Sequence, residues 1–151
     1  MRKQWMGIVV VAGVVAGQAQ VRAHDAKNLP PGPIHDRHEL MEGIGKNAKA
    51  IGNALKSGDL KAVPEAASAI KKDAAKILPL FPPGSTHAES RAKPEIWTDW
   101  KTFEAGAKDL EKTSGDLAAT AKSGGDVSAA ADKMFDNCKG CHEKFRVPEK
   151  K

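Results

Sequence analysis

The two cysteines of the chain, Cys138 and Cys141, lie three positions apart near the C-terminus, and His142 directly follows the second. This CxxCH spacing is typical of covalent c-type haem attachment, in which both thiols bond to the porphyrin and the imidazole binds the iron. Positions i, i+3 and i+4 share one face of an α-helix, so a helix here would direct all three groups at one flat cofactor. The sequence therefore predicts one haem c, bound through Cys138 and Cys141.

Other uses of the same five residues, CKGCH, fit the chain less well. A thioredoxin-like redox disulfide belongs to βαβ surroundings, and the sequence shows none. A structural zinc site usually takes four ligands, and no second Cys or His pair stands at a suitable spacing. A haem-free interaction or metal-binding protein would leave the motif without a role, and a chance occurrence of so short a motif is the remaining alternative.

Residues 1–23 have the pattern of a secretory signal peptide. Basic residues open the segment, an apolar run covers 8–15, and a small-x-small cleavage site ends at Ala23. The apolar run is too short to span a bilayer, so no stable membrane anchor is expected, and an uncleaved, tethered form is the alternative. We therefore expect cleavage after about Ala23, a single mature domain at 24–151 and a periplasmic location.

Net charge does not indicate a nucleic-acid partner. The formal net charge is +5, but Arg2, Lys3 and Arg22 lie within the signal segment, which has no acidic residue, so the mature chain would carry +2. Its charges alternate in sign, as on solvated helix faces. No nucleophile–base pair and no Gly-rich phosphate loop indicate enzymatic catalysis. We expect neither nucleic-acid binding nor an enzyme.

Composition favours an all-α fold with a small core. Large apolar side chains make up about a fifth of residues 24–151 and alanine about a sixth. Alanine has the highest helix propensity, and β-branched residues are scarce. A buried haem would add apolar bulk to such a core, although close-packed Ala-rich helices would explain the composition as well.

Apolar residues recur at three- and four-residue steps in four stretches, each of which predicts a helix. The first helix runs from about Ile34 to Ser57. The second helix begins at Asp59, a good N-cap, and Pro79 ends it. Because Pro64 is tolerated only in the first turn of a helix, a start nearer Val63 is the alternative. The third begins between 95 and 99 and runs to 122, and the fourth follows Asp126 as N-cap and carries CxxCH on its apolar face. The short connections predict an antiparallel up-down four-helix bundle with covalently bound haem.

His142 leaves the second axial position of the iron to be filled by another residue or by none. Met134 lies on the same helix as His142 and cannot reach the opposite haem face, so we expect it in the core. Met41 lies on the apolar stripe of another helix, beside Gly45 and Ala48, where a flat ring could approach. His38, one turn before Met41, is the competing ligand, and a purely packing role for Met41 is the other alternative.

The chain resembles the class II c-type cytochromes, the cytochrome c′ family. The resemblance rests on a signal peptide, four helices and a C-terminal CxxCHxxFR, and it covers the whole mature chain. Arg37-His38-Glu39-Leu40-Met41 is similar to the family's first-helix motif, where an arginine precedes the distal position by four residues. High-spin cytochromes c′ usually carry a non-ligating residue at that position, whereas Met41 is similar to the low-spin Met/His branch. The segment from Lys93 to Trp97 resembles that branch as well.

The resemblance implies a role for each matching residue. Cys138 and Cys141 would carry the thioethers, His142 would be the proximal ligand and Met41 the distal one. Arg37 would contact a haem propionate, although a solvent-facing helix charge is an equal alternative. Arg146 would lie near the proximal histidine and Trp97 near the haem edge, although a helix-terminal Arg and a bundle-capping Trp would look the same.

Two functions follow from the axial ligand. With Met41 bound, the iron is six-coordinate and suits one-electron transfer with redox partner proteins in the periplasm; this is the main prediction. With Met41 only packed nearby, the iron is five-coordinate and open to nitric oxide or CO, as in cytochromes c′; this is the alternative. Both monomers and homodimers occur in the family, so both are compatible with the sequence.

Overall fold

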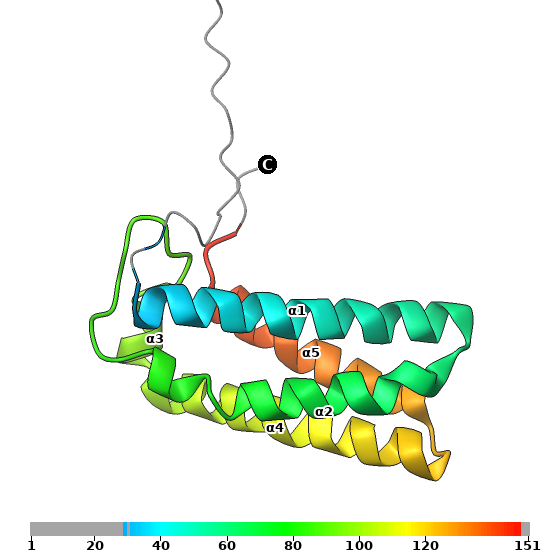
Figure 1. The fold of residues 1–151 in the computed structure, drawn as a ribbon. Helices are drawn as coiled ribbons and strands as arrows, with labels where there is room; N and C mark the ends of the chain where they lie inside the picture. Colours follow the sequence, from blue (N-terminus) through cyan, green and yellow to red (C-terminus); the bar gives the residue numbers. More distant parts are fainter. Residues whose placement is uncertain (1–28, 30, 149–151) are drawn as a thin grey trace, which may run out of the picture.

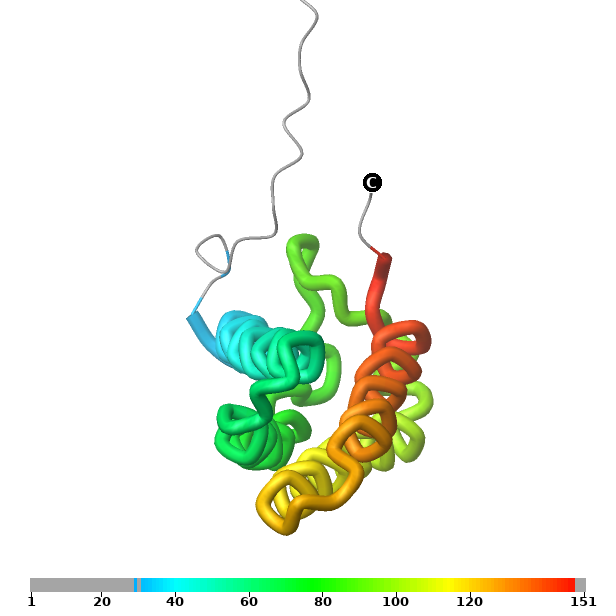
Figure 2. Tube along the Cα trace, turned by 90° about the vertical axis from the view of Figure 1, so that its right-hand side faces the viewer, coloured from blue at the N-terminus to red at the C-terminus, as the bar shows by residue number. Residues whose placement is uncertain are grey.

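The computed structural model describes residues 29 and 31–148, and within them all extended regular structure is helical. Four long helices surround a common interior (Figures 1 and 2). Their bounds are α1 Pro33–Ser57, α2 Val63–Ala74, α4 Trp100–Ser123 and α5 Val127–Phe145. The predicted all-α four-helix bundle is confirmed. The predicted signal peptide at 1–23 lies outside the described residues.

Local sequence explains where α1 ends and α2 begins. Pro33 occupies the first turn of α1, and Gly58 ends that helix with a left-handed φ of 76°. Asp59 caps a short 3-10 turn at Leu60–Ala62, and α2 starts at Val63, the later of the two expected positions. Pro64 therefore lies in the first turn of α2, where its missing N–H costs no helical hydrogen bond.

The third predicted helix is divided in two. A short helix, α3, covers Glu95–Thr98, the backbone leaves the helical region at Asp99, and α4 begins at Trp100. In α5, the Asp126 side chain accepts a 2.9 Å hydrogen bond from the Ala129 N–H, as expected of the N-cap. The CxxCH motif occupies the last two turns of that helix.

The core is built from small and medium-sized side chains contributed by every long helix. Ile51, Ile70, Leu117 and Met134 are fully buried, which confirms that Met134 is a core residue. Helix α2 packs along α4, α4 along α5 and α1 along α2, whereas α1 and α5 touch each other little. Among the described residues, no helix is long and apolar enough to cross a bilayer.

Candidate haem site

The three residues of the haem motif lie together on the last two turns of α5. Cys138, Cys141 and His142 are each partly buried, and both cysteines pack against the hydrophobic core. Helix α4 passes close to them at Gly106, where an added Cβ would lie 3.8 Å from Cys141 Sγ. Asn137 Nδ2 donates a 3.3 Å hydrogen bond to the Gly106 carbonyl across the same contact.

The protonation chemistry of these groups suits covalent haem. Burial raises the pKa of both thiols, so they stay as S–H at neutral pH. Burial, together with the positive charges of Arg146 and Arg91, lowers the pKa of His142. A neutral imidazole is the form that binds a metal. Two free, reduced thiols and a neutral imidazole on one half-buried helix face therefore fit the requirements of a c-type haem.

Met41 lies on α1, on the other side of the bundle interior from α5. Its side chain is partly buried and packs against the same core cluster as Cys138 and Cys141. The arrangement therefore places a thioether among the residues that face the shared interior. Ligation of iron by Met41 stays a prediction.

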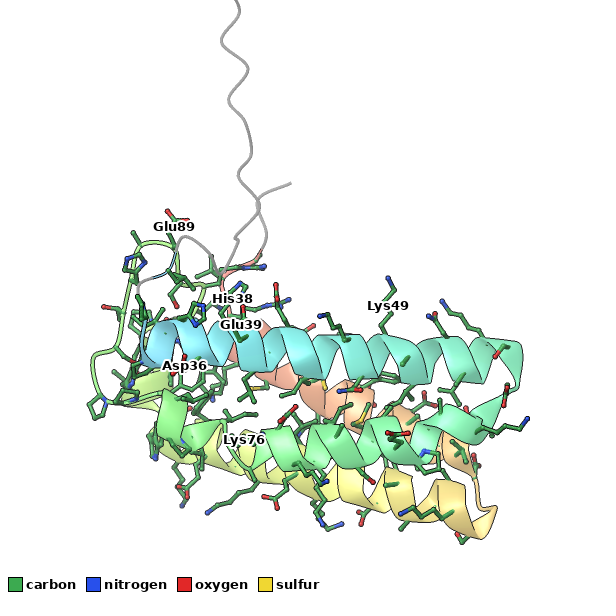
Figure 3. The ribbon with its side chains drawn as sticks, viewed as in Figure 1. Asp36, His38, Glu39, Lys49, Lys76 and Glu89 are labelled. Carbon is green, nitrogen blue, oxygen red and sulfur yellow. The ribbon has the colours of Figure 1, made fainter. Side chains whose placement is uncertain are left out.

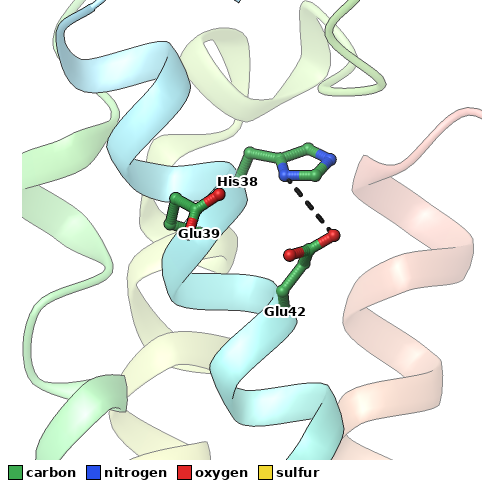
Figure 4. Close-up of side chains that lie close together, drawn as sticks. All are labelled: His38, Glu39 and Glu42. Carbon is green, nitrogen blue, oxygen red and sulfur yellow. Dashed lines mark ion pairs between the residues drawn. The ribbon is translucent and has the colours of Figure 1, made fainter. Parts of the chain in front are cut away.

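His38, the competing ligand, lies on α1 one turn before Met41 (Figure 3), and in Figure 4 its ring extends from α1 toward the side on which α5 lies. Its side chain is 24% exposed, and its Nδ1 atom is buried, without a hydrogen bond, 3.9 Å from Glu42 Oε1. The ligand atoms of His38, Glu39 and Glu42 lie within 4.8 Å of one another, but both carboxylates are exposed to solvent. The two carboxylates therefore belong to a solvated helix face, whereas the His38 ring is partly buried beside them.

Arg37 is buried, with only 4% of its surface exposed, so it is not the solvent-facing charge that the sequence allowed. Nη1 donates to Ser85 Oγ (2.9 Å), and Nη2 donates to the Ser85 carbonyl (2.8 Å) and to Ser90 Oγ (2.9 Å). The guanidinium also lies 4.8 Å from the centre of the Phe81 ring. A guanidinium has five N–H donors, and among described residues these bonds use three. The predicted contact with a haem propionate stays a prediction.

Trp97 and Arg146 lie at the same end of the bundle as the motif. Trp97 Nε1 donates to the carbonyls of Phe81 (3.2 Å) and Pro82 (3.0 Å), so this indole holds the loop that follows α2. Arg146 is exposed and directly follows α5, where its charge acts on His142. Arg146 thus lies near His142, and the predicted roles of Arg146 and Trp97 at a haem stay predictions.

Sequence reasoning missed Ser85 and Ser90, the partners of Arg37. Both lie in a Pro-rich connection without periodicity, about fifty positions from Arg37. The only available signal was the length of that connection, since long loops often border sites.

Known proteins with a similar sequence are cytochromes c′. The protein of this name from Rhodopseudomonas palustris is 30% identical to the chain, and the match covers 76% of this chain and 81% of the relative. The one from Pararhodospirillum photometricum is 31% identical, and the match covers 78% of this chain and 98% of the relative. The comparisons support the family predicted from the sequence, but not its low-spin branch, because cytochromes c′ are typically five-coordinate and high-spin.

Solved structures give the same result. Cytochrome c′ from Thermochromatium tepidum matches with 27% identity and a TM-score of 0.71, over 77% of this chain and 95% of that one. A nitric oxide complex of a cytochrome c′ variant from Alcaligenes xylosoxidans shares the fold at 22% identity, with a TM-score of 0.69 over 80% of this chain and all of the other. The model of the Cytochrome C' family matches residues 32–146. The chain therefore belongs to the cytochrome c′ family.

Proposed function

We propose that the protein holds one haem c through Cys138 and Cys141, with His142 as the proximal iron ligand, and binds a small gas such as nitric oxide or CO. The observation that carries this proposal is the family match over residues 32–146, together with two free thiols and a neutral imidazole on one face of α5. The nitric oxide complex of the Alcaligenes relative supports a gas ligand. The comparisons thus favour the alternative of the sequence analysis over its main prediction.

Bound haem supplies an iron that can change its oxidation state and accept an axial ligand. The chain's own residues hold and shield it. Desolvation keeps the His142 imidazole neutral, so that its lone pair is available, and the nearby Arg146 charge opposes protonation further. The apolar core beside Cys138 and Cys141 limits water at the site. Such a surrounding suits a neutral diatomic ligand, which needs no charged partner.

A one-electron carrier is the second candidate, and Met41 is the observation that favours it. Met41 stands four residues after Arg37, at the family's distal position, and its thioether faces the core shared with the two cysteines. A Met/His pair would keep the same ligands in both oxidation states and raise the reduction potential above that of a bis-imidazole site. Redox partner proteins would then be the physiological partners.

The optical spectrum of the haem-loaded protein distinguishes the two candidates. A high-spin spectrum that shifts at once on addition of CO supports the gas-binding protein. A far-red sulfur-to-iron band in the ferric form and split low-spin α and β bands in the ferrous form support Met41 ligation. That result contradicts the gas-binding proposal. If Met41 binds, Met41→Ala converts the second spectrum into the first, whereas the control Met134→Leu, a conservative change at a core methionine, leaves it unchanged.

We also propose that the protein acts in the periplasm, after cleavage of residues 1–23. Export and covalent attachment are testable together by fractionation of the producing cells and acid-acetone extraction. Mature protein in the periplasmic fraction with haem that resists extraction supports the proposal. Haem lost to the solvent would contradict covalent attachment.

A further inference from the structure

The separation of α1 and α5 decides which α1 side chain can approach an iron held by His142. These two helices contact each other little, since α1 packs mainly on α2 and α5 on α4. Residues 81–93 span the gap at the end of the bundle where the haem motif lies. In Figure 2 this loop, in green, stands between the start of α1 and the red segment after α5. We call residues 81–93 the strap.

Most of the strap, from Phe81 to Ser90, is anchored to α1 through Arg37. Three hydrogen bonds of 2.8–2.9 Å join its guanidinium to Ser85 and Ser90, and the Phe81 ring covers one of its faces at 4.8 Å. Hydrogen bonds from a charged donor are stronger than those between neutral groups. The planar guanidinium of Arg37 also fixes the directions in which its N–H groups donate. Arg37 lies one helical turn before Met41, so its position sets that of the Met41 turn.

The other end of the strap is anchored to the end of α5. Ala92 and Arg146 form an isolated antiparallel bridge, in which Lys93 N–H donates to the Phe145 carbonyl (2.9 Å) and Val147 N–H to the Arg91 carbonyl (2.8 Å). Lys93 Nζ also donates to the carbonyls of Glu143 (3.1 Å) and Lys144 (3.2 Å). The last carbonyls of a helix have no partner within it, and the strap satisfies three of them here.

We infer that the strap is a positioning device for the haem site, which holds the Met41 turn of α1 at a set distance from His142 on α5. Arg37, Ser85 and Ser90 are positioning residues in this device. The inference rests on the proposed haem site, and it holds for either axial state. With the strap in place, the Met41 turn would stay close to the residues that would hold the haem; with the strap loosened, that turn would move away and a gas ligand would gain access.

The test uses the haem-loaded protein with Ser85→Ala and Ser90→Ala combined. Amide hydrogen exchange at Lys93 and Val147 reports the anchoring of the strap, and the CO association rate of the ferrous protein reports access to the iron. We expect both to rise by roughly tenfold, because local opening becomes easier without global unfolding. Ser68→Ala is the matched control, since its hydroxyl donates only to the Pro64 carbonyl of its own helix (2.7 Å).

A conservative variant separates positioning from general stability. Ser85→Thr combined with Ser90→Thr keeps both hydroxyls and should restore slow exchange and slow CO association. Exchange and CO rates that change no more than in Ser68→Ala would overturn the inference, as would a rise in both that tracks only a lowered melting temperature. A wild-type chain without covalent haem would instead contradict the proposed function, and a comparison of exchange at Lys93 and Val147 between that chain and the serine variants would still show whether the Arg37 bonds hold the strap in place.

Discussion

At the scale of single residues, the Asp99 carboxylate joins the start of α4 to the end of α5. It accepts hydrogen bonds from Lys144 Nζ and from Thr102 Oγ1 (2.8 Å). The bond from Lys144 is the main cause that lowers the pKa of Asp99 below its ordinary value of 3.8, and the bond from Thr102 comes next. Lys144 lies two residues after His142, so this pair holds the turn of α5 that carries the CxxCH motif against α4.

Asp99→Asn should therefore destabilise the protein in a pH-dependent way. A carboxyl whose pKa is lowered in the folded state adds stability above pH 3.8, and that stability is lost as pH falls through the lower folded value. The melting temperature of Asp99→Asn should lie slightly below that of the wild type at neutral pH and match it well below pH 3.8. Because the pair is exposed, high salt should reduce the difference. A deficit that persists unchanged in acid would contradict this assignment.

At the scale of secondary structure, periodicity predicted the helices but not the breaks within them. Ile77 is buried and continues the apolar stripe of α2, yet that helix ends at Ala74. There the backbone changes to hydrogen bonds between residues three apart, such as Lys76 N–H to the Asp73 carbonyl (2.9 Å). Similarly, Ile96 and Phe103 lie on one continuous apolar stripe across the break at Asp99. The spacing of apolar residues indicates which face of a segment is directed at the core. A short break in the helix leaves that spacing almost unchanged, so the spacing does not predict the break.

The candidate site shows the same limit. Cys138, Cys141 and His142 could be found from the sequence because the chemistry sets their spacing within one helix. The bonds from Arg37 to Ser85 and Ser90 could not, because they join positions far apart through a loop without any period. Contacts of this kind depend on the tertiary arrangement and leave no local pattern.

Helix α1 offers a matched test of two glycines. Gly52 lies within the helix with nothing within 4 Å of an added Cβ, so Gly52→Ala should stabilise the protein by about 1 kcal/mol through helix propensity. Gly58 ends the helix at φ 76°, and Gly58→Ala should destabilise it by about 1 kcal/mol, since side chains avoid this conformation. Urea denaturation measures both. Equal effects of the same sign would contradict the role of Gly58 as a helix end.

At the scale of the whole molecule, the bundle has a well-packed side and a side with few direct contacts. Helices α2 and α4 share the most extensive interface, whereas α1 and α5 are joined mainly through the strap and the core between them. The residues proposed to meet the haem come from these two helices. Alanine supplies much of the apolar composition of the chain, and its small side chain adds little volume to a core. A haem bound between α1 and α5 would therefore contribute to the packing of the bundle.

Haem attachment should accordingly make a large contribution to folding stability. With Cys138→Ala and Cys141→Ala combined, we expect a lower melting temperature and a broader transition by circular dichroism, because a ligand that binds only the folded state stabilises it and a core without it is less cooperative. Lys139→Ala is the control: it lies within the same motif, is exposed, and leaves the thiols and the imidazole in place. The loss should be greatest at the α1 and α5 amides, since α2 and α4 support each other directly. A double variant that melts as sharply and at the same temperature as the control would show that the four helices form a complete core without the haem.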